Sequence, residues 1–312
     1  MSPKHLRLIA IGLAVLLLLW GGTEFFARGS DTVTGSLGLP AVDQAAVDTV
    51  TIVKGADSIV LAKQASTAWT VNGHPAALSA VGDLFQALKD TVRPELVAED
   101  TSSFARLNVD SAGARWLRLR SAGKPLLTLL AGGRGSEFSS VYVRRPGDAH
   151  VYLWRGRLAT VLDRSADDWR DKRIAALEPD SIAELEVARG ADRYTLRRAG
   201  RAWRVNGTAA DSAAVARYLE RLRAITASGF AEPKTADSLK ARRAVRRFTA
   251  RAATGRVLLA LAFDSTATGF LVRPLAGGSG GGGAGATVYR MNFWDVDGVT
   301  PASRSLAATP HK

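Results

Sequence analysis

The stretch Ala68-Trp-Thr-Val-Asn-Gly73 recurs as Ala202-Trp-Arg-Val-Asn-Gly207, and this repeat decides the fold. In each copy Trp and Val alternate with polar residues, a pattern typical of a strand with one buried face. Asn-Gly follows directly, and this dipeptide favours a two-residue turn between antiparallel strands. Two such hairpins, 134 residues apart in the chain, predict two copies of one domain.

The match between the two copies continues on both sides of the hairpin. Upstream, VTIVKGAD at 50–57 matches LEVARGAD at 185–192. Downstream, apolar residues spaced i, i+3, i+4 and i+7 predict one amphipathic helix in each copy. These residues are Val81, Leu84, Phe85 and Leu88 in the first copy and Val215, Tyr218, Leu219 and Leu222 in the second. Apolar segments at 125–130, 141–144 and 151–154 then recur in order at 257–261, 270–273 and 288–291.

Strands outnumber helices in this pattern and their connections are short, which favours antiparallel pairing. We therefore expect an α+β fold built from two tandem copies of a mostly antiparallel sheet with an amphipathic helix, preceded by a single N-terminal transmembrane helix. The expected organisation is a membrane anchor at 1–27, a flexible linker at 28–47, repeat domain 1 at 48–180, repeat domain 2 at 181–300 and a disordered tail at 301–312.

The N-terminus carries the signal of a membrane anchor. Lys4, His5 and Arg7 precede an uncharged run from Leu8 to Trp20, and the segment 6–26 reaches the length of a bilayer span. A cleaved signal peptide is the alternative, but its plausible exit, Glu24-Phe25-Phe26-Ala27, has Phe where cleavage needs a small residue. The positive-inside rule places the N-terminus in the cytoplasm. We expect a single-pass inner-membrane protein whose bulk is periplasmic.

The single span, the two Trp-x-Val-Asn-Gly hairpins and the segment SADDWRDKRI at 165–174 together resemble the domain of unknown function (DUF) 4340 family over residues 48–230. The residues that carry the resemblance are Trp69, Asn72, Gly73, Trp203, Asn206, Gly207, Trp169, Arg170, Asp171 and Lys172. The resemblance implies a bacterial membrane-anchored protein, often encoded beside ABC-type transport components related to gliding-motility auxiliary proteins. The family has no established catalytic residues to transfer.

A search for chemistry in the sequence finds no catalytic constellation. The chain has no Cys and four His, and no H-E-x-x-H motif or Ser/His/Asp order is present. Asp167, Asp168 and Asp171 resemble a divalent-ion site, but the basic residues interleaved with them favour a charge-paired turn. The run GGSGGGGAG at 277–285 precedes a strand rather than a helix, which indicates a loop rather than a phosphate site. We predict no cofactor, no metal site and no enzymatic activity.

Basic residues concentrate in the second copy, where residues 181–251 hold 16 Lys and Arg against 7 Asp and Glu. A helix near the end of this stretch would gather five arginines on one face, and that face could contact anionic lipid or an acidic partner. These residues are Arg242, Arg243, Arg246, Arg247 and Arg251. Nucleic acid is not expected, because only Phe248 lies nearby to stack on bases.

Two functions remain from the sequence. The first is a non-enzymatic, membrane-anchored extracytoplasmic binding or scaffold module, accessory to an ABC-type transporter or surface-polymer system. The alternative is an extracytoplasmic enzyme or ligand-binding protein with a site in the cleft between the two repeats.

Overall fold

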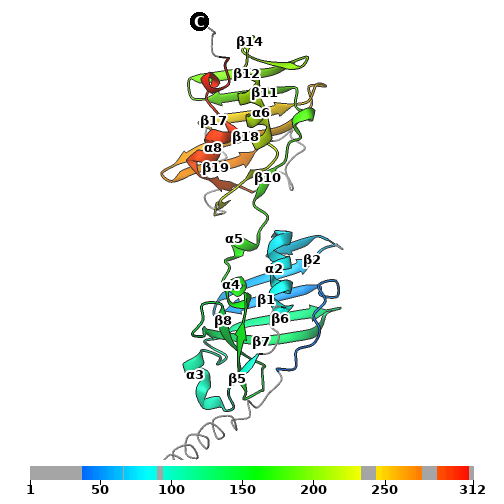
Figure 1. The fold of residues 1–312 in the computed structure, drawn as a ribbon, viewed down its shortest axis with the longest axis vertical. Coiled ribbons are helices and arrows are strands. Elements are labelled where there is room, and N and C mark those ends of the chain that lie inside the picture. Colours follow the sequence, from blue (N-terminus) through cyan, green and yellow to red (C-terminus); the bar gives the residue numbers. More distant parts are fainter. Residues whose placement is uncertain (1–36, 66, 90–93, 233–243, 276–286, 309–312) are drawn as a thin grey trace, which may run out of the picture. The chain divides into compact units, whose positions relative to one another are not determined.

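The computed structural model describes residues 37–65, 67–89, 94–232, 244–275 and 287–308. The predicted anchor at 1–27 and the glycine run at 277–285 lie outside these residues. None of the helices in the described part of the chain is long and apolar enough to cross a membrane. The chain divides into two compact units between Trp169 and Arg170 (Figure 1), N-terminal to the boundary expected near residues 178–180.

Unit 1 is built on a nine-stranded sheet in which every neighbouring pair is antiparallel. In spatial order its strands are β4 (His74–Pro75), β3 (Trp69–Val71), β2 (Asp57–Lys63), β1 (Thr49–Lys54), β6 (Arg115–Ser121), β7 (Lys124–Arg134), β8 (Ser140–Arg144), β9 (Val151–Arg155) and β5 (Glu95–Ala98). The sheet is accompanied by α2 (Leu78–Lys89), η1 (Thr101–Ser103), α3 (Phe104–Leu107), α4 (Leu158–Leu162) and α5 (Ala166–Trp169).

Unit 2 repeats this arrangement strand for strand in a second nine-stranded antiparallel sheet. Its spatial order is β14 (Thr208–Ala209), β13 (Ala202–Val205), β12 (Asp192–Ala199), β11 (Glu184–Arg189), β17 (Arg246–Arg251), β18 (Val257–Thr266), β19 (Gly269–Pro274), β20 (Tyr289–Met291) and β16 (Gly229–Phe230). The other elements are β10 (Arg173–Ala175) paired with β15 (Ile225–Thr226), and η2 (Pro179–Ser181), α6 (Ser212–Arg221), α8 (Phe293–Val299) and η3 (Ser303–Ser305).

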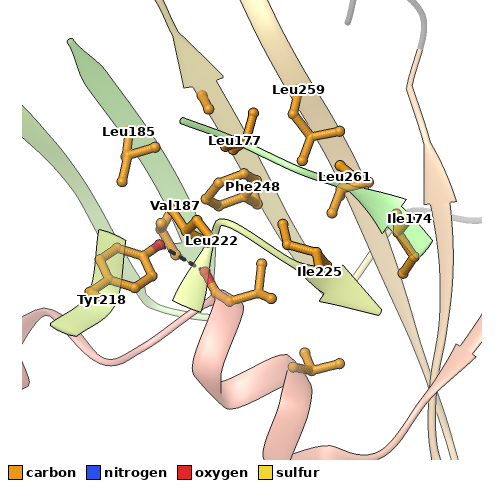
Figure 2. Close-up of a cluster of buried hydrophobic side chains, with 14 of the residues drawn as sticks. Ile174, Leu177, Leu185, Val187, Tyr218, Leu222, Ile225, Phe248, Leu259 and Leu261 are labelled. Carbon is orange, nitrogen blue, oxygen red and sulfur yellow. Dashed lines mark hydrogen bonds between the residues drawn. The ribbon is translucent and has the colours of Figure 1, made fainter. Parts of the chain in front are cut away.

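The structure thus confirms mostly antiparallel sheets with few helices. In each unit the amphipathic helix expected from the sequence buries its apolar stripe. On α6 these residues are Val215, Tyr218 and Leu219. They join the side chains that point from the sheet into the core, including Val187 and Phe248 (Figure 2). Burial of this apolar surface holds helix and sheet together.

The Asn-Gly hairpin turns are confirmed, and the structure shows why Asn is used. Asn206 and Gly207 have φ of 48° and 87°, so both central residues adopt the left-handed conformation of a type I′ turn. The Asn206 side chain also accepts a hydrogen bond from the Thr195 amide at 3.0 Å. Asn72 makes the equivalent bond with the Val60 amide at 2.8 Å. The turn residue therefore extends the hydrogen-bonded ladder of the neighbouring strand.

Part of the expected flexible linker belongs to the first unit. Leu37 and Val47 are buried in the unit 1 core, and Leu39 and Val42 pack against it. Val47 corresponds to the buried Ile182 at the offset of 135 residues that relates the two copies. The weak periodicity of this segment hid its structure, because isolated apolar residues can cover a core without forming a helix or strand.

The C-terminal residues 301–308 are ordered against unit 2, which corrects the expected disordered tail. Leu306 is buried, and its carbonyl oxygen accepts a hydrogen bond from the Asp211 amide at 2.9 Å. The carbonyl of Trp169 accepts the equivalent bond from the Ala77 amide in unit 1. The segment that follows α8 therefore closes the second repeat in the way that α5 closes the first.

We predict that Asn206→Ala lowers the free energy of unfolding by about 1–2 kcal/mol, because alanine tolerates the left-handed region less well than asparagine and cannot make the bond to Thr195. Asn206→Gly should cost less, because it keeps the permissive backbone. Urea denaturation followed by fluorescence would measure both. Equal stability of the two variants would contradict the proposed role of the turn conformation.

Candidate functional site

The first turn of α8 exposes two aromatic residues that the corresponding helix of unit 1 does not. Phe293, the first residue of α8, is 47% exposed, and Trp294 is 77% exposed. Leu158, the first residue of α4, is completely buried. A large aromatic side chain in water loses the free energy that burial would provide. By strand pairing, Trp154 of β9 corresponds to Met291 of β20, so Gly156 and Arg157 stand at the positions of Phe293 and Trp294. The fold therefore does not require aromatic residues at these two positions.

Beside Trp294 lies a groove of about 380 Å³, which we call the α8 groove. It runs between the end of α6, the strand β15, the end of β20 and the exposed side of α8. Its lining includes Arg221, Ile225, Met291, Trp294, Gly298 and Val299. Ile225, Met291 and Val299 are themselves largely buried and provide an apolar lining.

The charged residues of the groove are unequally partnered. Glu220 pairs with Arg223 at 2.8 Å, and Asp295 accepts a hydrogen bond from the Asn292 side chain, which caps α8. Arg221 has no hydrogen-bond or ion-pair partner among the described residues. Its guanidinium lies over α8, where a β-carbon at Gly298 would come within 3.4 Å of Nη1. Glycine at this position leaves room for an accessible positive charge next to the apolar lining.

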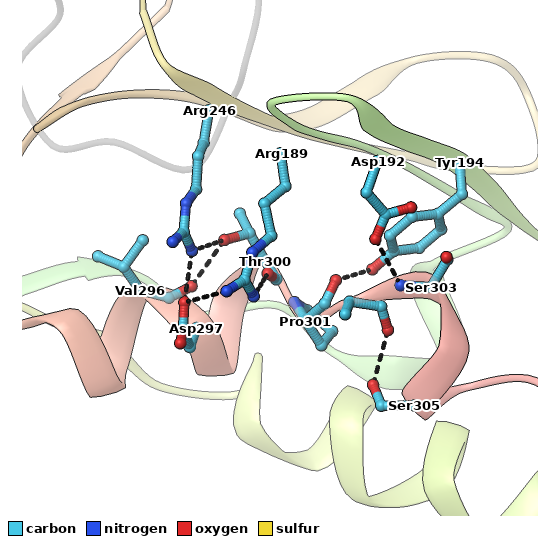
Figure 3. Close-up of polar contacts among 11 residues, drawn as sticks. Arg189, Asp192, Tyr194, Arg246, Val296, Asp297, Thr300, Pro301, Ser303 and Ser305 are labelled. Atoms are coloured by element: carbon cyan, nitrogen blue, oxygen red, sulfur yellow. Dashed lines mark hydrogen bonds and ion pairs between the residues drawn. The ribbon is translucent and has the colours of Figure 1, made fainter.

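Two sets of polar contacts fix α8 beneath this surface. The Tyr218 hydroxyl donates to the Val299 carbonyl at 2.8 Å, and burial raises the pKa of Tyr218 well above its usual value, so the phenol stays a donor. Asp297 of α8 forms ion pairs with two arginines of the sheet, Arg246 at 2.5 Å and Arg189 at 3.2 Å (Figure 3). Tyr218 therefore fixes the C-terminal end of α8, and the two arginines fix the side of α8 that faces the sheet.

The helix expected to carry the arginine face is a strand over its described residues. Residues 246–251 are the strand β17 rather than a helix, and Arg242 and Arg243 lie outside the described residues. Successive side chains of a strand point to opposite faces. Arg246 consequently turns inward to Asp297, whereas Arg247 is exposed on the other face and Arg251 approaches Glu186 at 3.6 Å. Of the three described members of the predicted cluster, Arg247 alone is exposed.

The family signature at 169–172 spans the boundary between the two units in the sequence, and its residues make packing contacts and hydrogen bonds. Trp169 is fully buried in unit 1, whereas Arg170 stacks 3.4 Å from the ring centre of Phe230 in unit 2. The Lys172 carbonyl accepts a hydrogen bond from the Ala227 amide at 2.7 Å. Asp171 accepts one from the Arg173 amide at 2.9 Å. The signature residue Trp69 is buried in the unit 1 core, and Trp203 is partly buried and packs against the unit 2 core.

The aspartates near Trp169 are used in local turns. Asp168 accepts a hydrogen bond from the Ser165 hydroxyl at 2.7 Å, and Asp171 lies 3.6 Å from Arg173. Within the described ranges, no group of three or more His, Asp or Glu side chains is arranged to hold a metal ion. The interleaved charges therefore stabilise the turn rather than gather into one ligand set.

A second cavity, of about 590 Å³, lies on the other side of Met291. Its polar lining includes Ser228, Thr266, Thr268 and Arg290. The Ser228 hydroxyl is already used, because it donates to the Arg290 carbonyl at 3.0 Å. Sequence reasoning missed both cavities. The only local signal was Phe293-Trp294 after the helix-capping Asn292, and exposure of those rings is a tertiary property.

Comparison with known proteins gives one family. The model of the family described as Domain of unknown function (DUF4340) matches residues 69–244. No curated protein and no solved structure matches the chain.

The contrasting positions of two adjacent arginines generate a stability prediction. Arg246→Gln should lower the free energy of unfolding by about 1–3 kcal/mol, because it removes a hydrogen-bonded charge that is only 13% exposed. Arg247→Gln should change it by less than about 0.5 kcal/mol, as expected for an exposed side chain. Chemical denaturation of the two variants would measure the difference, and a larger loss for Arg247→Gln would contradict the assigned strand faces.

Proposed function

The chain belongs to the DUF4340 family, and we propose that it is a non-enzymatic, membrane-anchored extracytoplasmic module that binds a membrane-protein partner. We further propose that this partner is part of an ABC-type transporter or surface-polymer system. The observation that carries the binding role is the exposed Trp294 at the α8 groove.

An exposed tryptophan beside an apolar groove is typical of a protein-binding hot spot. Such spots are enriched in Trp and Arg and lie over well-packed pockets. The α8 groove combines Trp294, the accessible Arg221 and the apolar lining of Ile225 and Met291. Unit 1 supplies the comparison, because Gly156 and Arg157 stand at the positions of Phe293 and Trp294. The fold itself therefore does not require exposed aromatic residues here.

The chemistry of the groove defines what a partner would present. An apolar side chain would pack against Trp294 and the groove lining, and a neighbouring carboxylate would pair with Arg221. Glu220 and Asp295 already have partners, so the remaining charge complementarity favours an acidic rather than a basic group. We propose that a partner segment with an apolar residue next to Asp or Glu occupies the α8 groove.

The membrane and transporter parts of the proposal rest on other observations. The apolar segment at 6–26 supports a single span with the N-terminus in the cytoplasm. Leu37 is buried in the unit 1 core, and only ten residues separate it from the end of the apolar segment in sequence, so we propose that unit 1 lies near the membrane surface. The association with ABC-type components is an expectation from the family resemblance.

We predict that Trp294→Ser reduces co-purification of the membrane partner at least tenfold, because removing a hot-spot Trp costs about 2 kcal/mol or more. Detergent extraction of the full chain after mild crosslinking, with quantitative mass spectrometry, would measure the loss. Phe138→Ser is the matched control, because Phe138 is 80% exposed in unit 1. An equal effect of both variants, or no effect of Trp294→Ser, would contradict the proposal that the α8 groove binds the partner.

The anchor makes a separate prediction. Deleting residues 1–27 should move the protein from the membrane fraction to the soluble fraction, because no other segment of comparable hydropathy is expected to insert. Alkaline phosphatase fused after residue 312 should be active in the full chain, since the C-terminus is expected outside the cytoplasm. An inactive fusion that is expressed at normal level would contradict the topology.

A further inference from the structure

The face of the unit 2 sheet that points away from α6 carries a distinct charge pattern. Val187 and Phe248 lie in the core. The residues that alternate with them, Ala188 and Arg247, therefore lie on the opposite face, which we call the outer face. Antiparallel sheets commonly leave one face in contact with water. On this face Glu186 of β11, Arg193 of β12 and Arg247 of β17 are exposed, whereas Ala262 of β18 is buried.

Five residues form one row across the outer face. Arg193 of β12 is opposite Ala188 of β11, which is opposite Arg247 of β17. Arg247 is opposite Ala262 of β18, which is opposite Arg273 of β19. Each arginine is thus two strands from the next, or about 9–10 Å, and each pair is separated by an alanine. We call Arg193, Arg247 and Arg273 the arginine row.

The three charges of the row differ in how they are neutralised. Arg273 donates to the largely buried Asp264 at 3.1 Å. Arg193 and Arg247 are exposed, and within the described residues neither has a hydrogen-bond or ion-pair partner. Two uncompensated guanidinium groups therefore stand on either side of Ala188, whose small side chain leaves the space between them open.

Unit 1 shows that the fold does not need these two arginines. The same row of its sheet consists of Ser58, Val53, Trp116, Leu130 and Arg144. Ser58 replaces Arg193 and Trp116 replaces Arg247, whereas an arginine with internal contacts stands at the far end in both units. The structural arginine is common to both sheets, and the exposed pair belongs to unit 2 alone.

We propose that Arg193 and Arg247 bind an extended acidic segment of a protein partner. Guanidinium groups make paired, charge-assisted hydrogen bonds with carboxylates. A separation of 9–10 Å corresponds to about three residues of extended chain, so the segment should carry Asp or Glu at about that spacing. This contact lies on the face opposite the α8 groove, and it does not depend on the groove being occupied.

The surroundings of the row favour a protein over a membrane. Glu184 and Glu186 lie on the same outer face and pair with Arg197 and Arg251, respectively. Acidic and basic side chains are therefore interspersed on the outer face beside the row, so its positive charge is not continuous. A membrane surface presents negative charge over its whole area, whereas a polypeptide segment can align with one row. Charge complementarity of this kind selects a partner and its register.

The test places a photo-crosslinking amino acid at Ala188, between the two arginines, in the full-length protein in its native membrane. Mass spectrometry of the crosslinked peptide should find a partner segment with at least two carboxylates within about six residues. The double variant Arg193→Ser/Arg247→Gln should reduce this crosslink about tenfold. Thr249, half-exposed on the same face, is the second position for the crosslinker if the Ala188 variant does not fold.

The control variant is Arg201→Ser/Arg217→Gln, which removes the same charge from two exposed positions outside the row. Crosslinking to lipid, to a segment without acidic residues, or to nothing at both positions would overturn the proposal. An equal loss with the control variant would also overturn it, because net charge alone would then explain binding. Trp294→Ser should leave this crosslink in place, which separates failure of the row from failure of the groove.

Discussion

Burial of one face of each nine-stranded sheet is the constraint on which the rest of the structure depends. A shift of one residue in register would exchange the two faces of every strand. Val187 and Phe248 in the core fix this register in unit 2, and α6 covers them. The same register turns Arg246 inward to Asp297 and leaves Arg247 outside. Two adjacent, chemically identical residues thus acquire a structural role and a surface position, respectively.

The duplication explains why much of the fold could be predicted from the sequence. Trp-x-Val-Asn-Gly occurs twice, and the positive φ of Asn72 and Asn206 is the conformation that Asn-Gly favours. The strand β17 was missed because its arginine spacing also fits a helix. Its alternation is clearer in the first copy, where Trp116 to Arg120 alternates strictly in β6. Aligning 246–251 with that segment would have indicated a strand.

The candidate site could not be predicted in the same way, because exposure is decided by distant residues. Asn292 marks the start of α8 in the sequence, but nothing local distinguishes an exposed Trp294 from a buried one. The length of α6, the position of β15 and the absence of a side chain at Gly298 together leave the groove open. Likewise, Arg193 and Arg247 are 54 residues apart and meet only through their shared neighbour Ala188.

Comparison of the two units separates residues that the fold requires from residues that it permits. Both units use an Asn-Gly turn, a helix with a buried apolar stripe, and a backbone bond to Trp169 or Leu306 that closes the repeat. They differ where unit 2 exposes Trp294 and where it carries Arg193 and Arg247. Exposed aromatic surface lowers solubility unless a partner covers it, whereas solvated arginines provide positive charge that an acidic partner can neutralise. Because unit 1 folds the same way without either feature, partner binding by unit 2 is the simplest physical reason for retaining both.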